Sequence, residues 1–139
     1  MPLTHRAPAG PRGLVGAAAE TAAAQHLRAL GWHVLARNLR VQRDEIDILA
    51  REPGTPDVIV VLEVRSRSGP GFGAAVESVD ARKVARLYRA AWSLQCEGHP
   101  ELPTSATEGA VWRVDLLALV RDRDGGWCLE RHLRGLQPT

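Results

Sequence analysis

Apolar positions recur along the chain with two periods, and the longer period predicts a helix near the N-terminus. Residues 14–30 are rich in alanine, and Ala23, Leu27 and Leu30 fall on one helical stripe. Gly31 follows directly, as glycine commonly does just beyond a helix C-terminus. We therefore expect a helix over residues 14–30, with Leu30 on its apolar stripe.

A second helix is predicted after Asp80, because aspartate favours the N-cap position, where its carboxylate accepts a hydrogen bond from the first turn. Apolar residues then follow at the i, i+3, i+4 and i+7 spacing of one helix face, namely Val84, Leu87, Tyr88 and Ala91. Before this helix, the glycine-rich residues 68–75 predict a loop.

Strands are predicted where apolar residues alternate or form short runs between turn signals. The third predicted strand is apolar on both faces at its start, as in a strand covered on both sides. The last, after the Asp124-Gly125-Gly126 turn, is expected at a sheet edge. The predicted strands are 32–40, 44–51, 57–67, 111–120 and 127–133. The resulting order α-β-β-β-α-β-β indicates an α/β protein with a single domain.

Length and composition fit one domain over residues 14–136. Residues 1–13 carry three prolines and two arginines without an apolar stretch, which predicts a disordered tail and no secretory signal. No apolar run approaches the ~20 residues of a membrane span. We therefore expect a cytoplasmic protein with no membrane partner.

An acidic residue stands in the most core-like strand. Glu63 directly follows five apolar residues, and a carboxylate there is costly unless it is paired or bound to a cation. If the second and third strands form a hairpin centred on Thr55, Asp47 faces Glu63 and Glu45 faces Arg65. Opposed carboxylates repel each other. A divalent cation between them would offset that repulsion, and Mg²⁺ binds one or two carboxylates together with water and phosphates.

Alternation along the second strand places Asp47 and Leu49 on one face and Ile46 and Ile48 on the other. In the first helix, Glu20 shares a stripe with alanines and leans toward the sheet. Taken alone, Glu20 is more typical of a helix acid exposed to water. Together, Glu20, Asp47 and Glu63 predict a metal site.

Five short motifs follow one another along the chain: Asp44-Glu45-Ile46-Asp47, Glu63-Val64-Arg65-Ser66-Arg67, Phe72-Gly73, Val79 with Lys83, and Trp112-Arg113-Val114-Asp115. This ordered set resembles the YraN-type family of small endonucleases, over roughly residues 15–119. The resemblance implies the fold of the PD-(D/E)xK nuclease superfamily, which includes restriction endonucleases and Holliday junction resolvases. In that fold helices flank a mixed β-sheet.

The resemblance also implies a site and an activity. Glu20, Asp47 and Glu63 would hold Mg²⁺ or Mn²⁺, with the backbone carbonyl of Val64 as a further ligand. The implied reaction is metal-dependent hydrolysis of DNA, with branched or junction DNA as candidate substrates. The implied catalytic residues are Asp47, Glu63 and Arg65. Arg65 stands where the family has lysine. It keeps the positive charge but cannot lose a proton at any useful pH.

Basic residues near the predicted site are candidates for contacts with DNA phosphates. They are Arg43, Arg67, Arg82, Lys83, Arg86 and Arg89, of which Arg82, Arg86 and Arg89 form a stripe opposite the apolar face of the second helix. A stripe of this kind is also typical of a helix face exposed to water. Phosphate contacts give affinity without reading sequence.

Two alternatives stay open beside the nuclease. One is a nucleic-acid-binding domain that kept the fold and lost hydrolysis, and the other is a protein-interaction module in a DNA repair or uptake assembly. Divalent-metal binding separates the nuclease from the interaction module. Salt-dependent DNA binding without cleavage indicates the binding domain. A homodimer would suit a two-fold symmetric substrate.

Overall fold

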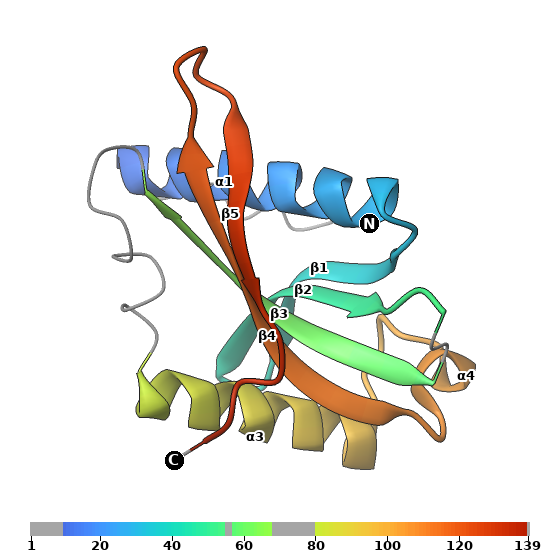
Figure 1. The fold of residues 1–139 in the computed structure, drawn as a ribbon. Coiled ribbons are helices and arrows are strands. Elements are labelled where there is room, and N and C mark those ends of the chain that lie inside the picture. The colour runs from blue at the N-terminus through green and yellow to red at the C-terminus, as the bar shows by residue number, and fades with distance from the viewer. Residues whose placement is uncertain (1–9, 55–56, 68–79, 139) are drawn as a thin grey trace.

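The computed structural model describes residues 10–54, 57–67 and 80–138, and places one sheet between two helices (Figure 1). Helix α1 (Gly10–Ala29) lies on one face and α3 (Ala81–Glu97) on the other. The sheet order is β1-β2-β3-β4-β5, and only the β3–β4 pair is parallel. The strands are β1 (His33–Val41), β2 (Asp44–Arg51), β3 (Val58–Arg67), β4 (Val111–Arg121) and β5 (Trp127–Leu133). The predicted single α/β domain with a mixed sheet is confirmed.

Most predicted elements agree with the structure, and their ends differ by a few residues. Helix α1 begins at Gly10 rather than at residue 14, so residues 10–13 of the predicted tail are helical, while residues 1–9 lie outside the described part. The predicted loop 68–75 also lies outside it. A short helix, α4 (Thr104–Thr107), was not predicted. None of the described helices is long and apolar enough to cross a membrane.

The predicted place of Leu30 on the apolar stripe is wrong, since this side chain is 56% exposed. Helix α1 ends at Ala29, and Gly31 has a left-handed φ of 94° that turns the chain away from the helix axis. The backbone N–H of Trp32 then bonds to the carbonyl of Leu27 at 2.9 Å. Trp32 is consequently buried beside the helix end, where Leu30 was expected.

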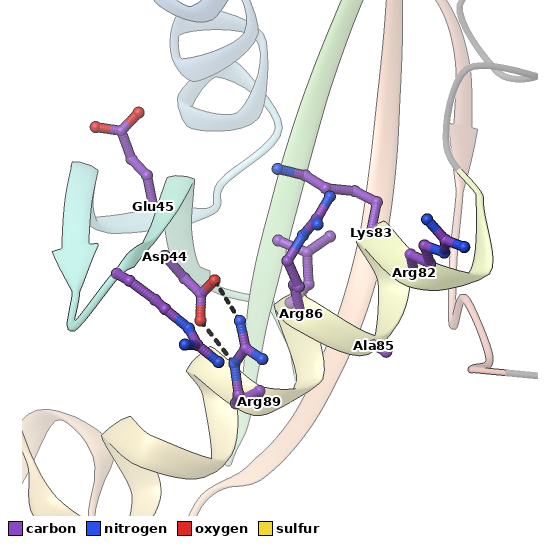
Figure 2. A pocket seen from close by; sticks show the side chains of 9 residues that line it. Asp44, Glu45, Arg82, Lys83, Ala85, Arg86 and Arg89 are labelled. Atoms are coloured by element: carbon purple, nitrogen blue, oxygen red, sulfur yellow. Dashed lines mark hydrogen bonds and ion pairs between the residues drawn. The ribbon is translucent and has the colours of Figure 1, made fainter.

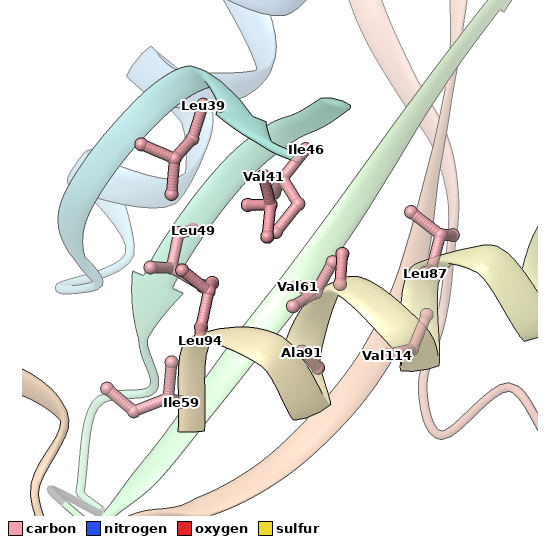
Figure 3. Packing of buried hydrophobic residues seen from close by; sticks show 11 residues of the cluster. Leu39, Val41, Ile46, Leu49, Ile59, Val61, Leu87, Ala91, Leu94 and Val114 are labelled. Carbon is pink, nitrogen blue, oxygen red and sulfur yellow. The ribbon is translucent and has the colours of Figure 1, made fainter. Parts of the chain in front are cut away.

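Each face of the sheet packs its own hydrophobic cluster. On the α3 side, apolar residues of β1, β2, β3 and β4 pack against the apolar stripe of α3 (Figure 3). The predicted stripe is confirmed, because Val84, Leu87 and Ala91 are buried and Tyr88 packs at the margin. On the α1 side, residues of β2, β3 and β4 pack against alanines and Leu27 of α1. Packing against a helix on each of its two faces therefore stabilises the sheet.

The strict alternation predicted for β2 is wrong, because the strand changes face at Asp47. Ile46 packs in the cluster beside α3, whereas Ile48 packs in the cluster beside α1. The neighbouring strand is irregular at the same level. Asn38, between the pairs that Ile46 and Ile48 make with β1, has a left-handed φ of 51°. The left-handed backbone at Asn38 rotates the pair of strands between Ile46 and Ile48. These two residues therefore point to opposite faces of the sheet, although they are two positions apart.

The sheet opens into a fork where β2 and β3 separate. Their antiparallel pairing runs from Arg51–Ile59 to Ile48–Leu62, which confirms the predicted hairpin register. The pairs predicted beyond that point, Asp47 with Glu63 and Glu45 with Arg65, do not form, because β2 stays with β1 while β3 continues along β4. We call this opening between β2 and β3 the fork.

Asp115, which is fully buried in β4, fastens the C-terminal end of the sheet. Arg113 donates to its Oδ1 from Nε at 2.8 Å and to its Oδ2 from Nη2 at 2.9 Å. The Nε2 of His132 lies 2.8 Å from Oδ2, and the N–H of Gly135 donates to Oδ1 at 2.9 Å. Both carboxylate oxygens are therefore fully engaged, and they tie the end of β5 and the segment after it to β4.

Replacing Asp115 with Asn is expected to lower the free energy of unfolding by about 3 kcal/mol at pH 7, because Arg113 would lose its buried partner. Burial raises the pKa of Asp115, but hydrogen bonds from His132, Arg113 and Gly135 lower it from 3.8 to about 2. The stabilisation is thus present above pH 3.8 and is lost as the pH falls through 2. Urea unfolding at pH 7 and pH 2 measures the difference.

The control for this substitution is Glu101→Gln, which neutralises an exposed acid in the segment between α3 and α4. It should change stability by no more than about 0.5 kcal/mol. Equal stability of the Asp115→Asn variant and the parent at pH 7 would contradict the fastening role.

Candidate functional site

The fork brings Asp47 of β2 to the backbone of β3. The Oδ2 of Asp47 accepts a hydrogen bond from the N–H of Val64 at 2.8 Å, so a side chain replaces the missing strand partner. The N–H and C=O of one strand residue point to the same edge of the strand. The Val64 carbonyl therefore lies on the fork edge as well, beside Asp47.

Glu63 is 4% exposed at the same level of β3 and is approached by two cations. Arg65 Nη2 lies 3.0 Å from Glu63 Oε2, and Lys83 Nζ lies 3.7 Å from Oε1. Only the first distance is within hydrogen-bond range. Oε1 of Glu63 and Oε1 of Glu20 are both buried without a hydrogen bond from any described residue. Within the part of the chain that the structure describes, these two carboxylate oxygens therefore have no hydrogen-bond donor.

The electrostatics place Glu20, Asp47 and Glu63 in one neighbourhood. Burial raises the pKa of Glu20 to about 7, opposed by the positive charge of Arg37 and reinforced by the charges of Glu45 and Glu63. Burial also holds the pKa of Asp47 well above its usual value, and the negative charges of Glu63 and Glu20 raise it further. The three acids thus interact across α1, β2 and β3.

The three acids do not form a ready-made ligand set. Within the described residues, no three His, Cys, Asp or Glu side chains are grouped closely enough to hold a metal ion. The Glu63 carboxylate instead faces Arg65 and Lys83. A cation would therefore have to draw the three carboxylates closer together.

A basic groove of about 740 Å³ adjoins the fork, between the start of β2 and the first half of α3 (Figure 2). Its lining residues are Arg43, Asp44, Glu45, Arg82, Lys83, Ala85, Arg86, Leu87 and Arg89. Asp44 and Arg89 join its two walls, with Arg89 Nε and Nη2 donating to the Asp44 carboxylate at 3.0 and 2.8 Å. The hydrogen bond from Arg89 lowers the pKa of Asp44. We call this surface the basic groove.

The structure separates the predicted DNA-contacting residues into four groups, one of which is Lys83, which lines the basic groove and lies 3.7 Å from Glu63. Arg43, Arg82 and Arg86 line the basic groove and make no ion pair or hydrogen bond with another described side chain. Arg89 lines it too, but its guanidinium is engaged by Asp44. Arg67 forms an ion pair with Glu130 of β5 and does not belong to the described lining of the groove.

Three residues near the site received no role from the sequence. Asp44 closes the basic groove through Arg89, and Arg37 and the side chain of Asn38 act on the Glu20 carboxylate. No local pattern could reveal the Asp44 contact, because its partner is 45 positions away. The sequence held one indication at Asn38, because asparagine tolerates the left-handed backbone conformation that this residue adopts.

Comparisons with known proteins agree on a family. Residues 19–119 match the model of the "Uncharacterised protein family UPF0102". A UPF0102 protein of Acidothermus cellulolyticus is 40% identical over 131 residues, which cover 91% of this chain and 96% of that protein. A UPF0102 protein of Deinococcus radiodurans is 39% identical over 120 residues, covering 84% and 89%.

Among solved structures, the chain is similar to Pyrococcus furiosus SfsA in complex with Ca²⁺, with 16% identity and a TM-score of 0.35. That alignment covers 89% of this chain and 64% of the SfsA chain. The family match is the informative result, since its residues include Glu20, Asp47 and Glu63 together with the whole of α3. On this match and on relatives aligned over most of their length, the chain belongs to the UPF0102 family.

Proposed function

We propose that this protein is a metal-dependent endonuclease that hydrolyses phosphodiester bonds in DNA. The observation that carries the proposal is the presence of two acids at the fork, Asp47 bonded to the Val64 N–H at 2.8 Å and Glu63 only 4% exposed, whose charges and that of Glu20 act on one another. Burying acids together is costly unless a cation or protons neutralise them. A perturbed carboxylate cluster beside a basic groove is typical of a functional site rather than of a packing element.

The donor atoms at the fork fit a hard divalent cation. Carboxylate oxygens and a backbone carbonyl are the ligands that Mg²⁺ and Mn²⁺ take in proteins. Glu20, Asp47, Glu63 and the carbonyl of Val64 would hold such an ion. The buried Oε1 atoms of Glu20 and Glu63 accept no hydrogen bond from the described part of the chain, so both can serve as ligands.

When bound, Mg²⁺ would polarise the phosphate and lower the pKa of a coordinated water. Residues of the chain position the carboxylates and supply positive charge. The hydrogen bond from Val64 N–H fixes the Asp47 carboxylate, and the ion pair with Arg65 places a permanent positive charge beside Glu63. Positive charge at this point stabilises the negative charge that develops on the phosphate in the transition state.

The groove supports a nucleic acid as the partner. Arg43, Arg82 and Arg86 present guanidinium groups that pair readily with phosphate oxygens. These contacts would hold the backbone without reading base sequence. The proposal therefore names DNA, bound mainly through its phosphates, as the substrate class.

Asp47→Ala and Glu63→Ala are each expected to abolish metal-dependent cleavage, because each removes a ligand from the proposed cation site. Cleavage of branched, single-stranded and duplex DNA with Mg²⁺ or Mn²⁺ measures the effect. Asp57→Asn is the matched control, since it neutralises an exposed acid at the other end of β3. Circular dichroism and thermal unfolding confirm that the variants are folded.

The other outcomes assign the chain to a different class. Salt-dependent DNA binding without cleavage by the parent would identify a nucleic-acid-binding domain on the same fold. Absence of both cleavage and metal-dependent DNA binding would overturn the nuclease and favour a protein-interaction module.

Glu20→Gln is expected to stabilise the metal-free protein at pH 8 and to leave it unchanged at pH 4. The pKa of Glu20 rises from 4.5 to about 7 on folding, so its stability contribution is complete below pH 4.5 and is lost as the pH rises through 7. Removing the charge should recover about 1–2 kcal/mol at pH 8, allowing for partial exposure to water. Urea unfolding in EDTA measures this.

The same two proteins test the ligand role of Glu20. Added Mg²⁺ should raise the melting temperature of the parent at pH 8, and the increase should be smaller in Glu20→Gln, because one ligand loses its charge. An equal increase in both proteins would exclude Glu20 from the cation site.

Arg65→Lys is expected to retain metal-dependent cleavage within about tenfold of the parent, because the proposed role of Arg65 is electrostatic and lysine keeps its charge. Single-turnover rates at saturating protein measure the effect. A much larger gain would show that the guanidinium impedes the reaction, and a complete loss would show that its planar geometry is required.

A further inference from the structure

Lys83 joins the two parts of the site. It is the only lysine of the chain, and it lies in the first turn of α3, whose N-cap Asp80 accepts a hydrogen bond from the Lys83 N–H at 3.0 Å. Its ammonium lies 3.7 Å from Glu63 at the fork, and the same residue lines the basic groove. In Figure 2 its side chain extends away from α3, apart from that of Arg82.

Glu63 attracts the ammonium of Lys83 but does not form a hydrogen bond with it. Its distance of 3.7 Å from Oε1 is longer than a hydrogen bond, and Oε1 has no hydrogen bond from any described residue. The Lys83 side chain is 27% exposed, so it is partly held by the fold and still reachable from the groove. Its three N–H donors are thus available to a ligand oxygen.

Arg65, the other cation at Glu63, is held more tightly. Its Nη2 is within hydrogen-bond range of Glu63 Oε2 at 3.0 Å, and its Nε is buried without a described partner. Arg65 is also absent from the described groove lining. Lys83 is therefore the cation at the fork that a ligand lying in the basic groove would meet.

We propose that Lys83 binds the scissile phosphate directly, and that the DNA strand runs along the basic groove and over Lys83 to the carboxylates of the fork. This inference rests on the proposed function and adds the path of the substrate and a catalytic residue. The pairing of Lys83 with Glu63 at 3.7 Å and its place in the groove lining carry it.

The contact is electrostatic. In hydrolysis, a bond forms between the water oxygen and phosphorus, the phosphorus–oxygen ester bond breaks, and the leaving oxygen takes up a proton from water. Lys83 keeps its protons throughout and donates hydrogen bonds to a non-bridging phosphate oxygen. A compact ammonium suits this position, because it can approach one oxygen while Glu63 stays close.

The first test uses the single lysine as a chemical probe. An amine-directed acetylating reagent should modify the folded parent at Lys83 and at the N-terminal α-amino group. Oligo(dT) with Ca²⁺ in place of Mg²⁺ should slow acetylation of Lys83 about tenfold or more, as expected for an amine engaged by a bound phosphate. The N-terminal amine is the internal control, and peptide mass spectrometry reads both positions without any need for cleavage.

The second test compares two charge-removing variants of the same helix turn. Lys83→Gln should lower the single-turnover cleavage rate with Mn²⁺ by about 10²–10³-fold, as for the loss of one donor to a transition-state oxygen. Arg82→Gln should weaken DNA binding by at most about tenfold, the effect of one phosphate contact, and should lower the cleavage rate at saturation far less than Lys83→Gln does. Arg82 is exposed, and its side chain makes no ion pair with another described residue.

The outcomes separate this inference from the proposed function. Protection of Lys83 in a parent that does not cleave supports the phosphate contact and overturns hydrolysis. Cleavage by the parent with full acetylation of Lys83, or an equal rate in Lys83→Gln, overturns the contact and leaves the nuclease standing. Bound oligo(dT) without protection of Lys83 also overturns the contact, and absence of any nucleic-acid binding overturns both.

Discussion

The separation of β2 from β3 is the constraint on which the rest of the structure depends. A strand that leaves its neighbour exposes backbone groups that need new partners. Here the Asp47 carboxylate accepts the hydrogen bond from Val64 N–H at 2.8 Å, in place of a β2 carbonyl. This contact gives the β3 backbone a hydrogen-bond partner at the fork and places an acid there, on the same edge as the Val64 carbonyl. Without the fork, β2 and β3 would pair through, and the opposed acids would repel each other.

Two acids among the described residues, Asp115 and Glu63, are fully or nearly buried, and they differ in how many hydrogen bonds they accept. Asp115 accepts hydrogen bonds at both oxygens from Arg113, His132 and Gly135, and so fastens the end of the sheet. Glu63 has two cations nearby, yet its Oε1 has no hydrogen bond from any described residue. A fully satisfied buried carboxylate is typical of a structural network, whereas an incompletely satisfied one indicates a place for a ligand. The contrast within one sheet supports the assignment of the site to the fork.

The buried acids at the fork reduce the stability of the fold. Burial raises the pKa of Glu20 to about 7, so its charge weakens the fold above that pH. Burial and the charges of Glu63 and Glu20 also hold the pKa of Asp47 well above its usual value. Arg65 and Lys83 offset part of this cost from β3 and α3. The acids come from α1, β2 and β3, and two hydrophobic clusters fix these elements relative to one another. The rigid sheet thus holds groups together that would otherwise separate.

The sequence by itself determined the elements and much of the register. The spacing of Val84, Leu87 and Ala91 predicted the buried face of α3, and the turn near Thr55 predicted the pairing of Leu49 with Val61, because both depend on local periodicity. It also pointed to Glu63, since an acid after five apolar residues is unusual at any tertiary arrangement. The UPF0102 family followed from the ordered motifs and relatives.

Only the tertiary structure decided what happens around Asp47. Alternation assumed a regular strand, but the left-handed backbone of Asn38 turns the strand pair, and the end of the β2–β3 ladder opens the fork. The contacts of Asp44 with Arg89 and of Lys83 with Glu63 likewise join positions 45 and 20 residues apart on different elements. Hydrophobic periodicity is a property of neighbours along the chain, so it predicts which face a residue prefers. Which charged groups meet depends on how separate elements pack, and that is set by the whole core.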